Sequence, residues 1–257
     1  MLLNIDGVDI NYEIYGEGES ALLILHGWMG SIPAMAPIWQ YFRKDRKVVV
    51  IDFPGQGGKS GIPKEACGVP EYGEMVKKFL ELLKIEKPDV IGHSFGGRVI
   101  IYLASKYTEI FNKIILTDAA GIKPKISIKR FIKIKSYKFG KFILNMFCPK
   151  AKREQKLNEL RKKYGSSDYA LLSSDVMRET FNKVINLDLK NNLKDIKSPT
   201  LLIWGEKDES TPLYMAKIME KEIKDSGLVV LENAGHFSYL DESYRYNLIV
   251  ENFLGGK

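Results

Sequence analysis

Short apolar runs alternate along the chain with longer stretches whose apolar residues recur every three or four positions. The short runs have the length and boundaries of buried strands, and the longer stretches have the period of amphipathic helices. Eight strands are predicted, at Leu2–Asp6, Asp9–Tyr15, Ala21–Leu25, Lys47–Ile51, Asp89–Gly92, Lys113–Thr117, Thr200–Trp204 and Leu228–Glu232. Helices are predicted at Ala34–Lys44, Tyr72–Lys84, Ser94–Lys106, Leu213–Lys224 and Asp241–Phe253. The alternation predicts an α/β fold, with an eight-stranded, mostly parallel sheet and flanking helices.

The stretch 122–195 departs from this alternation, because it contains no run typical of a buried strand. Helix-like segments dominate it, at Lys129–Phe147 and Lys150–Lys163. The chain shows no internal repeat and no low-complexity linker around this stretch. We therefore expect residues 122–195 to form a helical lid inserted into a core of residues 1–121 and 196–257, and not an independent domain.

The composition is that of a globular protein, with 45% hydrophobic and 28% charged residues among 257. The N-terminus lacks a signal-like segment and no run reaches the roughly 18 apolar residues of a membrane span, so we expect a cytoplasmic protein. Cys67 and Cys148 lie far apart, without a cysteine or histidine at metal-ligand spacing. They are interpreted as reduced, structural residues, and no metal site is expected.

Gly92-His93-Ser94-Phe95-Gly96 follows a predicted strand directly and precedes a predicted helix. The segment fits the pattern G-x-S-x-G in the strand–turn–helix context that this pattern requires. A serine on such a turn has its hydroxyl exposed above the sheet, and the N–H groups of the following helix favour developing negative charge. Ser94 is therefore the candidate nucleophile, and the alternative is an ordinary glycine-rich turn that opens a helix.

A serine hydroxyl needs a base that takes its proton, and the chain has three histidines. His236 follows the last predicted strand, at the same edge of the sheet as Ser94. His26 and His93 lie immediately beside strand ends and are interpreted as structural or hydrogen-bonding residues. His236 is therefore the candidate general base.

The third group has to be a carboxylate that orients the imidazole. Asp208 follows the predicted strand Thr200–Trp204, and the order Ser94, Asp208, His236 agrees with nucleophile, acid and base. The competing carboxylates in loops after strands are Glu206, Glu209 and Asp118. Asp208 is preferred because its strand directly precedes that of the histidine, and Asp118 ranks second.

Acyl transfer also needs N–H donors for the oxyanion. Phe95, the residue after the nucleophile, offers one backbone N–H at the start of a helix. The second is expected from Trp28 in the glycine-rich loop His26-Gly27-Trp28-Met29-Gly30. Because this loop carries a donor, Gly27 and Met29 are expected to lie at the substrate pocket.

With these residues in place, the chain resembles the α/β-hydrolase fold family over essentially its whole length outside the lid. The segment Asp52-Phe53-Pro54-Gly55-Gln56-Gly57-Gly58-Lys59-Ser60 is similar to the family's D-x-P-G-x-G-x-S loop, with one extra residue before the serine. Gln56 stands where the family usually has histidine. The position of the lid after the sixth strand also matches the family.

The resemblance implies hydrolysis through an acyl-enzyme without a cofactor. Haloalkane dehalogenases and epoxide hydrolases are disfavoured, since they place aspartate where this chain has Ser94. Carbon–carbon bond hydrolases, prolyl aminopeptidases and perhydrolases keep the serine triad and remain alternatives. The expected substrate is a small-molecule carboxylic ester with a small or medium, apolar acyl or aryl group, as for a carboxylesterase.

The charge of the chain is unevenly distributed. Residues 123–163 hold fifteen Lys or Arg and two Glu, a net +13, whereas the whole chain carries +7 and the remainder therefore −6. A basic patch attracts nucleic acid, anionic lipid or acidic substrates. A function in binding polyanions or a membrane surface is thus the alternative from another class. We expect no nucleic-acid partner, and we leave a weak association of residues 123–163 with anionic surfaces open.

Overall fold

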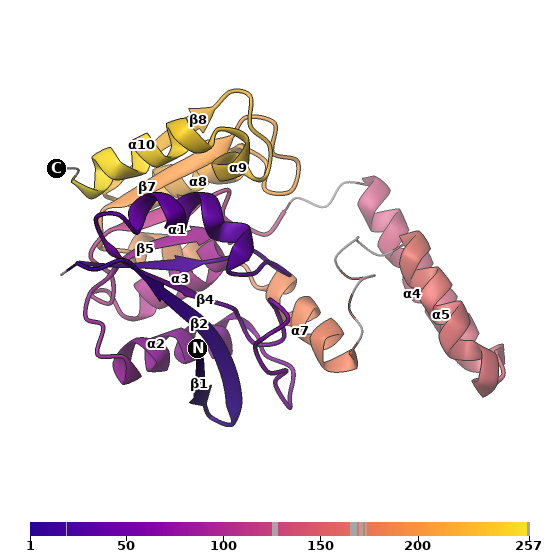
Figure 1. The fold of residues 1–257 in the computed structure, drawn as a ribbon. Coiled ribbons are helices and arrows are strands. Elements are labelled where there is room, and N and C mark those ends of the chain that lie inside the picture. The colour runs from indigo at the N-terminus through magenta and orange to yellow at the C-terminus, as the bar shows by residue number, and fades with distance from the viewer. Residues whose placement is uncertain (19, 125–127, 165–168, 170–171, 173, 256–257) are drawn as a thin grey trace.

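A single sheet of eight strands runs through the body of the molecule, with helices packed on both faces (Figure 1). The structure is a computed structural model that describes residues 1–18, 20–124, 128–164, 169, 172 and 174–255. The strands are β1 (Leu2–Ile5), β2 (Val8–Tyr15), β3 (Ala21–Leu25), β4 (Lys47–Ile51), β5 (Asp89–His93), β6 (Ile114–Thr117), β7 (Thr200–Gly205) and β8 (Ser226–Leu231). Their order across the sheet is β1-β2-β4-β3-β5-β6-β7-β8.

The strands pair antiparallel at the N-terminal edge of the sheet and parallel elsewhere. β1 and β2 form an antiparallel hairpin whose turn residues, Asp6 and Gly7, have φ angles of 51° and 83°, as a two-residue turn between twisted strands requires. β2 also pairs antiparallel with β4, and all further pairs are parallel. The central strands are buried on both faces and rich in Val, Ile and Leu, which is typical of parallel sheets. The predicted eight-stranded, mostly parallel α/β sheet is confirmed.

Two apolar clusters join the helices to the sheet. On one face, α2 (Val69–Leu82), α3 (Phe95–Lys106) and α8 (Tyr214–Glu222) contribute to the larger cluster. On the other face, α1 (Ala36–Phe42), α9 (Ser238–Asp241) and α10 (Ser243–Leu254) contribute to the second. These layers hold the carboxyl ends of the parallel strands, and the loops that follow them, in fixed positions.

Two helix starts differ from the predicted ones because of prolines. The predicted helix from Ala34 is divided into a 3-10 turn, η1 (Pro33–Met35), and α1, and each begins with a proline in its first turn. α2 begins earlier than predicted, at Val69, where Pro70 fits the first turn and the Glu71 carboxylate accepts a hydrogen bond from Gly68 N at 2.7 Å. Proline is tolerated at these positions because the first N–H groups of a helix lack partners within it.

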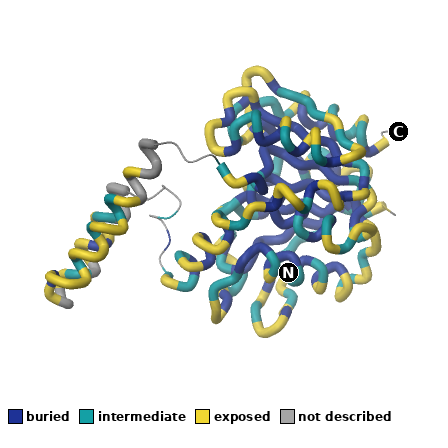
Figure 2. Tube along the Cα trace, turned by 180° about the vertical axis from the view of Figure 1, so that it is seen from behind, coloured by how far each residue is buried: buried dark blue, intermediate teal, exposed yellow. Residues whose placement is uncertain are grey.

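Helices also make up the described part of the predicted lid. They are α4 (Ile128–Phe147), α5 (Lys150–Tyr164), α7 (Asp175–Asn186) and a 3-10 segment, η2 (Lys190–Asp195). α4 and α5 lie side by side and project from the body (Figure 1). Their described residues are largely exposed, whereas the central strands are buried (Figure 2). α7 and η2 instead pack on the body, where Val184 and Leu193 belong to the larger cluster.

Candidate active site

Ser94 lies in the turn between β5 and α3, with φ of 48° and ψ of −107°. A residue other than glycine with such backbone angles is strained by about 1–3 kcal/mol. The neighbouring glycines allow the chain to pass through this turn. A Cβ at Gly92 would lie 2.4 Å from Ile100 Cδ1, and a Cβ at Gly96 would lie 2.2 Å from Leu25 O. The structure therefore explains the glycines of the G-x-S-x-G pattern by close contacts with the helix and the neighbouring strand.

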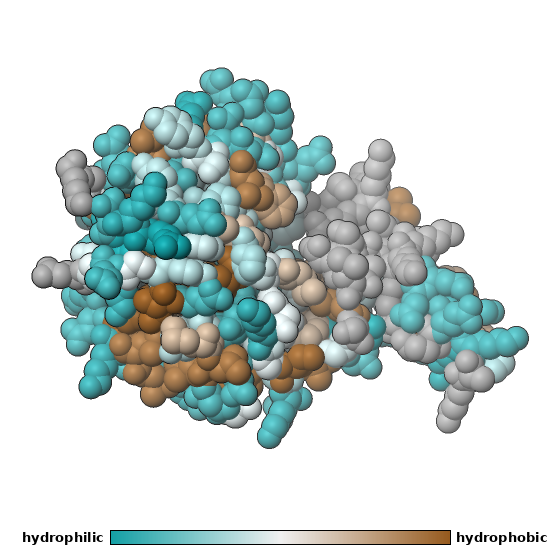
Figure 3. All heavy atoms as spheres, viewed as in Figure 1, coloured by the Kyte–Doolittle hydropathy of each residue, from teal (hydrophilic) through white to brown (hydrophobic). Residues whose placement is uncertain are grey.

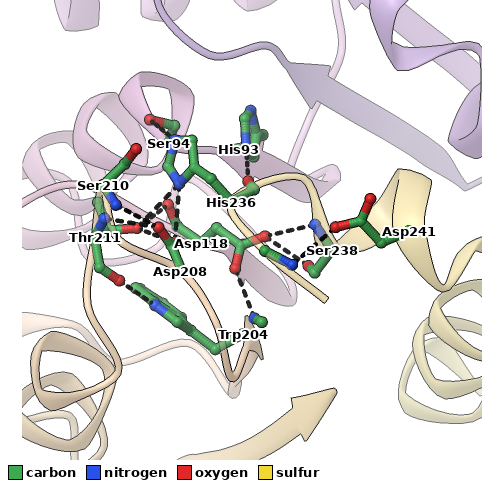
Figure 4. Close-up of polar contacts among 12 residues, drawn as sticks. His93, Ser94, Asp118, Trp204, Asp208, Ser210, Thr211, His236, Ser238 and Asp241 are labelled. Carbon is green, nitrogen blue, oxygen red and sulfur yellow. Dashed lines mark hydrogen bonds and ion pairs between the residues drawn. The ribbon is translucent and has the colours of Figure 1, made fainter. Parts of the chain in front are cut away.

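His236 follows β8 and lies between the side chains of Ser94 and Asp208 (Figure 4). Its Nε2 is 3.1 Å from Ser94 Oγ, and its Nδ1 is 2.8 Å from Asp208 Oδ2. Because the carboxylate accepts the Nδ1 proton, the neutral ring presents an unprotonated Nε2 to the serine. Three loops, after β5, β7 and β8, thus bring together three residues that lie far apart in the sequence.

The Asp208 carboxylate is buried and surrounded by hydrogen-bond donors. Ser210 N and Thr211 N donate to Oδ1 at 2.8 and 2.9 Å, and Thr211 Oγ1 donates to Oδ2 at 2.6 Å. Burial alone raises the pKa of Asp208, but hydrogen bonds from His236 and Thr211 outweigh it and hold the pKa below its ordinary value. The carboxylate is therefore ionised at neutral pH.

Asp118, the second-ranked acid, lies at the end of β6 and is buried. Its Oδ1 accepts a hydrogen bond from Gly205 N at 2.8 Å, and its Oδ2 accepts two from Ser238, from N at 3.1 Å and from Oγ at 2.6 Å. Burial raises the pKa of Asp118 to about 7, although these hydrogen bonds lower it. The contact with the imidazole is made by Asp208, while Asp118 joins the loops that carry Asp208 and His236.

The other two histidines bind backbone groups. His26 Nδ1 donates to Gly27 O at 2.7 Å, and its Nε2 accepts from Phe53 N at 3.1 Å. His93 Nε2 donates to His236 O at 2.8 Å. Burial, with the neighbouring His236, lowers the pKa of His93 to about 3, so its ring stays neutral at neutral pH.

The predicted oxyanion donors lie on two segments beside Ser94. A Cβ at Gly27 would lie 3.3 Å from Ser94 Cβ, so the backbone of this loop passes next to the serine. The rings of Trp28 and Phe95 pack edge to face, with centroids 5.4 Å apart. Phe95 is the first residue of α3, and N–H groups at that position have no partner within a helix.

Ser94 and His236 open into a cavity of about 560 Å³. Much of its lining is apolar, including Trp28, Ala34, Met35, Phe95, Ala120, Ile122, Pro124, Phe181, Val184, Ile185, Met215 and Phe237. The residues from α7 had not been singled out in the sequence. Their spacing of three and four positions was visible as a helix face, but the sequence did not show that this face covers the cavity.

A family model described as alpha/beta hydrolase fold matches residues 20–153 and 139–243. The chain belongs to the alpha/beta hydrolase fold family. Mouse "Monoacylglycerol lipase ABHD6" is 25% identical over 254 residues, which cover 92% of this chain and 76% of that protein. A "2-hydroxy-6-oxononadienedioate/2-hydroxy-6-oxononatrienedioate hydrolase" of Burkholderia vietnamiensis is 26% identical over 275 residues, covering 97% and 92%. The crystal structure of MGS-M2, an alpha/beta hydrolase enzyme from a deep-sea metagenome library, superposes with a TM-score of 0.76 at 22% identity, covering 100% and 98%.

The glycine-rich loop after β4 contacts the loop that carries Trp28 in this alpha/beta hydrolase. Gln56 Oε1 accepts a hydrogen bond from Met29 N at 2.8 Å, and Met29 has a φ of 57°. The sequence had shown Gln56 only as a departure from the family's histidine, and its partner could not be read from the sequence.

Met29 had been expected at the substrate pocket. Its side chain is 43% exposed, and it does not appear among the described residues that line the cavity. Gly27, the other residue predicted at the pocket, belongs to that lining. Met29 contributes to this region through its backbone, whose N–H bonds to Gln56.

Proposed function

We propose that this alpha/beta hydrolase is a serine esterase in which Ser94 is the nucleophile, His236 the general base and Asp208 the acid. The observation that carries the proposal is the hydrogen-bonded chain from Ser94 Oγ through His236 to Asp208, with its distances of 3.1 and 2.8 Å. A serine hydroxyl is a weak nucleophile at neutral pH, and a base within hydrogen-bond reach removes that limitation.

The reaction follows from these positions. Ser94 Oγ attacks the carbonyl carbon, and its proton passes to His236 Nε2 while Asp208 stabilises the resulting imidazolium. The backbone N–H groups of Trp28 and Phe95 bind the oxyanion of the tetrahedral intermediate. The alcohol leaves with the proton from His236, and an acyl-enzyme forms on Ser94. A water molecule, activated by His236, then attacks the acyl-enzyme and releases the acid.

The cavity supports an apolar acyl or aryl group of small or medium size, because apolar side chains from the body and from α7 surround the serine. We assign residues 122–195 the role of a lid, since α7 belongs to that stretch and contributes Phe181, Val184 and Ile185 to the lining. Mouse monoacylglycerol lipase, which matches most of the chain, supports an ester as the bond that is cleaved.

A second candidate is hydrolysis of a carbon–carbon bond by the same three residues. The observation that favours it is the relative from Burkholderia vietnamiensis, a hydrolase of an oxo-dienedioate that matches 97% of this chain. Both reactions use the same serine and cavity, so they differ in the substrate that is turned over.

The test combines labelling with a substrate panel. The wild-type protein is expected to react with a fluorophosphonate probe and to hydrolyse p-nitrophenyl esters, and Ser94→Ala should lose both activities. Ser105→Ala, at the other end of α3, is the matched control and should keep both. Labelling of Ser94→Ala at the wild-type rate would refute the assignment of Ser94 as the nucleophile. Labelling of the wild type, with turnover of a vinylogous 1,5-diketone acid and none of any ester, would favour the second candidate.

A further inference from the structure

α4 carries a row of exposed apolar side chains on the side that does not pack against α5. Toward α5 the contact is close, since a Cβ at Gly140 would lie 2.9 Å from Leu160 Cδ1, and Leu157 is buried. Phe147, the last residue of α4, is exposed, and the exposed apolar side chains before it are Ile132, Phe139, Phe142, Ile143 and Met146. They are named the α4 apolar face here. Positions 132, 139, 143 and 146 are separated by seven, four and three residues, so they share one side of the helix.

The size of this face calls for a partner. Single exposed apolar residues are common on protein surfaces, but a contiguous row on one helix marks an interaction site. Phe139 is 66% exposed and Met146 is 59% exposed. No helix among the described residues is long and apolar enough to cross a membrane.

The charge around the face decides which partner fits. Residues 123–163 carry a net +13, and the described lysines Lys138, Lys141, Lys152 and Lys156 are exposed. On the visible side of the α4–α5 pair, most of the coloured, described side chains are hydrophilic (Figure 3). A second copy that met this face with its own α4–α5 pair would place two strongly basic segments together, at an electrostatic cost. A nucleic acid would bind the lysines but leave the apolar face in water. An anionic bilayer satisfies both groups, because acyl chains receive the apolar side chains and headgroup phosphates receive the lysines.

We propose that the α4–α5 pair docks this enzyme on the surface of an anionic phospholipid bilayer, with the α4 apolar face in the headgroup–acyl boundary. Ile122 and Pro124, shortly before α4, line the cavity that contains Ser94. The α4–α5 pair that docks therefore follows directly, in the sequence, on residues that line the cavity. Membrane binding itself does not depend on the proposed esterase activity, so it is tested separately from catalysis.

The experiment measures co-sedimentation of the full chain with phosphatidylcholine vesicles that contain or lack phosphatidylserine. We expect binding to the anionic vesicles, little binding to phosphatidylcholine alone, and weaker binding at high salt. Phe139→Ser with Phe142→Ser, and separately Lys138→Gln with Lys141→Gln, should each weaken the apparent affinity roughly tenfold or more. The matched controls are Leu82→Ser on α2 and Lys221→Gln with Lys224→Gln near the end of α8, which should bind as the wild type does. Circular dichroism and thermal unfolding verify that each variant folds.

Four results would overturn the proposal. The first is absence of binding to anionic vesicles at low salt, as expected if the face closes on the protein's own body. The second is equal binding to both kinds of vesicle. The third is lipid-free self-association that the phenylalanine substitutions abolish, which would make a second copy the partner. The last is binding to anionic vesicles and heparin that the lysine substitutions weaken and the phenylalanine substitutions leave unchanged, which would indicate a polyanion surface.

Discussion

Asp118 Oδ2 accepts hydrogen bonds from both the backbone N and the hydroxyl of Ser238, at 3.1 and 2.6 Å, two residues after His236. The other carboxylate oxygen of Asp118 accepts from Gly205 N, three residues before Asp208. One buried side chain at the end of β6 therefore fixes the loop of the proposed base and the loop of the proposed acid relative to each other (Figure 4).

Asp118→Asn is expected to lower kcat for an ester by roughly tenfold to a hundredfold, with little change in KM. Asparagine has one acceptor oxygen, so its NH₂ group has to face either Ser238 or Gly205 N and cannot accept from it. Small displacements of catalytic groups are costly. Asp241→Asn is the control for a weaker support of the loop that carries His236. Asp241 is exposed and accepts one bond, from Gly235 N at 2.8 Å, so its substitution should lower kcat less than Asp118→Asn does. Steady-state kinetics measures both, and an Asp118→Asn enzyme with wild-type kcat would contradict this positioning role.

Asp118 should also make stability depend on pH. Its pKa is about 7 in the folded protein against an ordinary value of 3.8, and burial is the main cause. Between these values the folded state keeps a proton that the unfolded chain has lost, so the contribution of Asp118 to the free energy of unfolding decreases as pH rises. The slope is at most about 1.4 kcal/mol per pH unit. Urea unfolding of the wild type and of Asp118→Asn at several pH values in this range gives the free energy of unfolding of each protein as a function of pH. The wild-type value should fall more steeply as pH rises, and parallel pH dependences would argue against the raised pKa.

Asp208→Asn separates the two candidate acids. An amide at this position cannot stabilise the imidazolium of His236 and favours the wrong tautomer, so kcat should fall on the order of 10³ to 10⁴. This loss should exceed that of Asp118→Asn, because of the two carboxylates it is Asp208 that contacts the imidazole, at 2.8 Å. Glu209→Gln, an exposed substitution in the same loop, is the control. If Asp118→Asn were the more damaging change, the role of the acid would move to Asp118.

Gln56→Ala tests whether Gln56 holds the loop of the proposed oxyanion donor Trp28 in position. Gln56 is buried, and loss of its side chain removes the acceptor of Met29 N, next to the Trp28 N–H. We expect kcat to fall by roughly tenfold, since the proposed oxyanion donor, Trp28 N–H, loses its fixed position. Gln40→Ala, an exposed change on α1, should leave kcat unaltered. A lower kcat/KM that arises from KM alone would indicate a role in substrate binding instead.

The sequence predicted what depends on local pattern. The strands followed from apolar runs, and the candidates Ser94, Asp208 and His236 followed from their positions after strands. Contacts between distant segments could not be obtained this way. The bonds from Asp118 to Gly205 and Ser238 span 87 and 120 positions, and no local pattern distinguishes such a carboxylate from one that contacts the histidine. For the same reason, the hydrogen bond of Gln56 could not be predicted, because its partner Met29 lies 27 positions away.

Ile185→Trp tests whether α7 limits the size of the acyl group. Ile185 is partly buried on α7 and lines the cavity beside Ser94. A larger side chain there should occupy space that a longer acyl chain needs, so kcat/KM should fall roughly tenfold for a p-nitrophenyl ester of medium chain length and change little for the acetate. Asn182→Trp places the same side chain at an exposed position of α7 and should alter neither value. The ratio of the two kcat/KM values is the measurement. An equal loss for both esters would show that α7 acts through folding or access and does not select chain length.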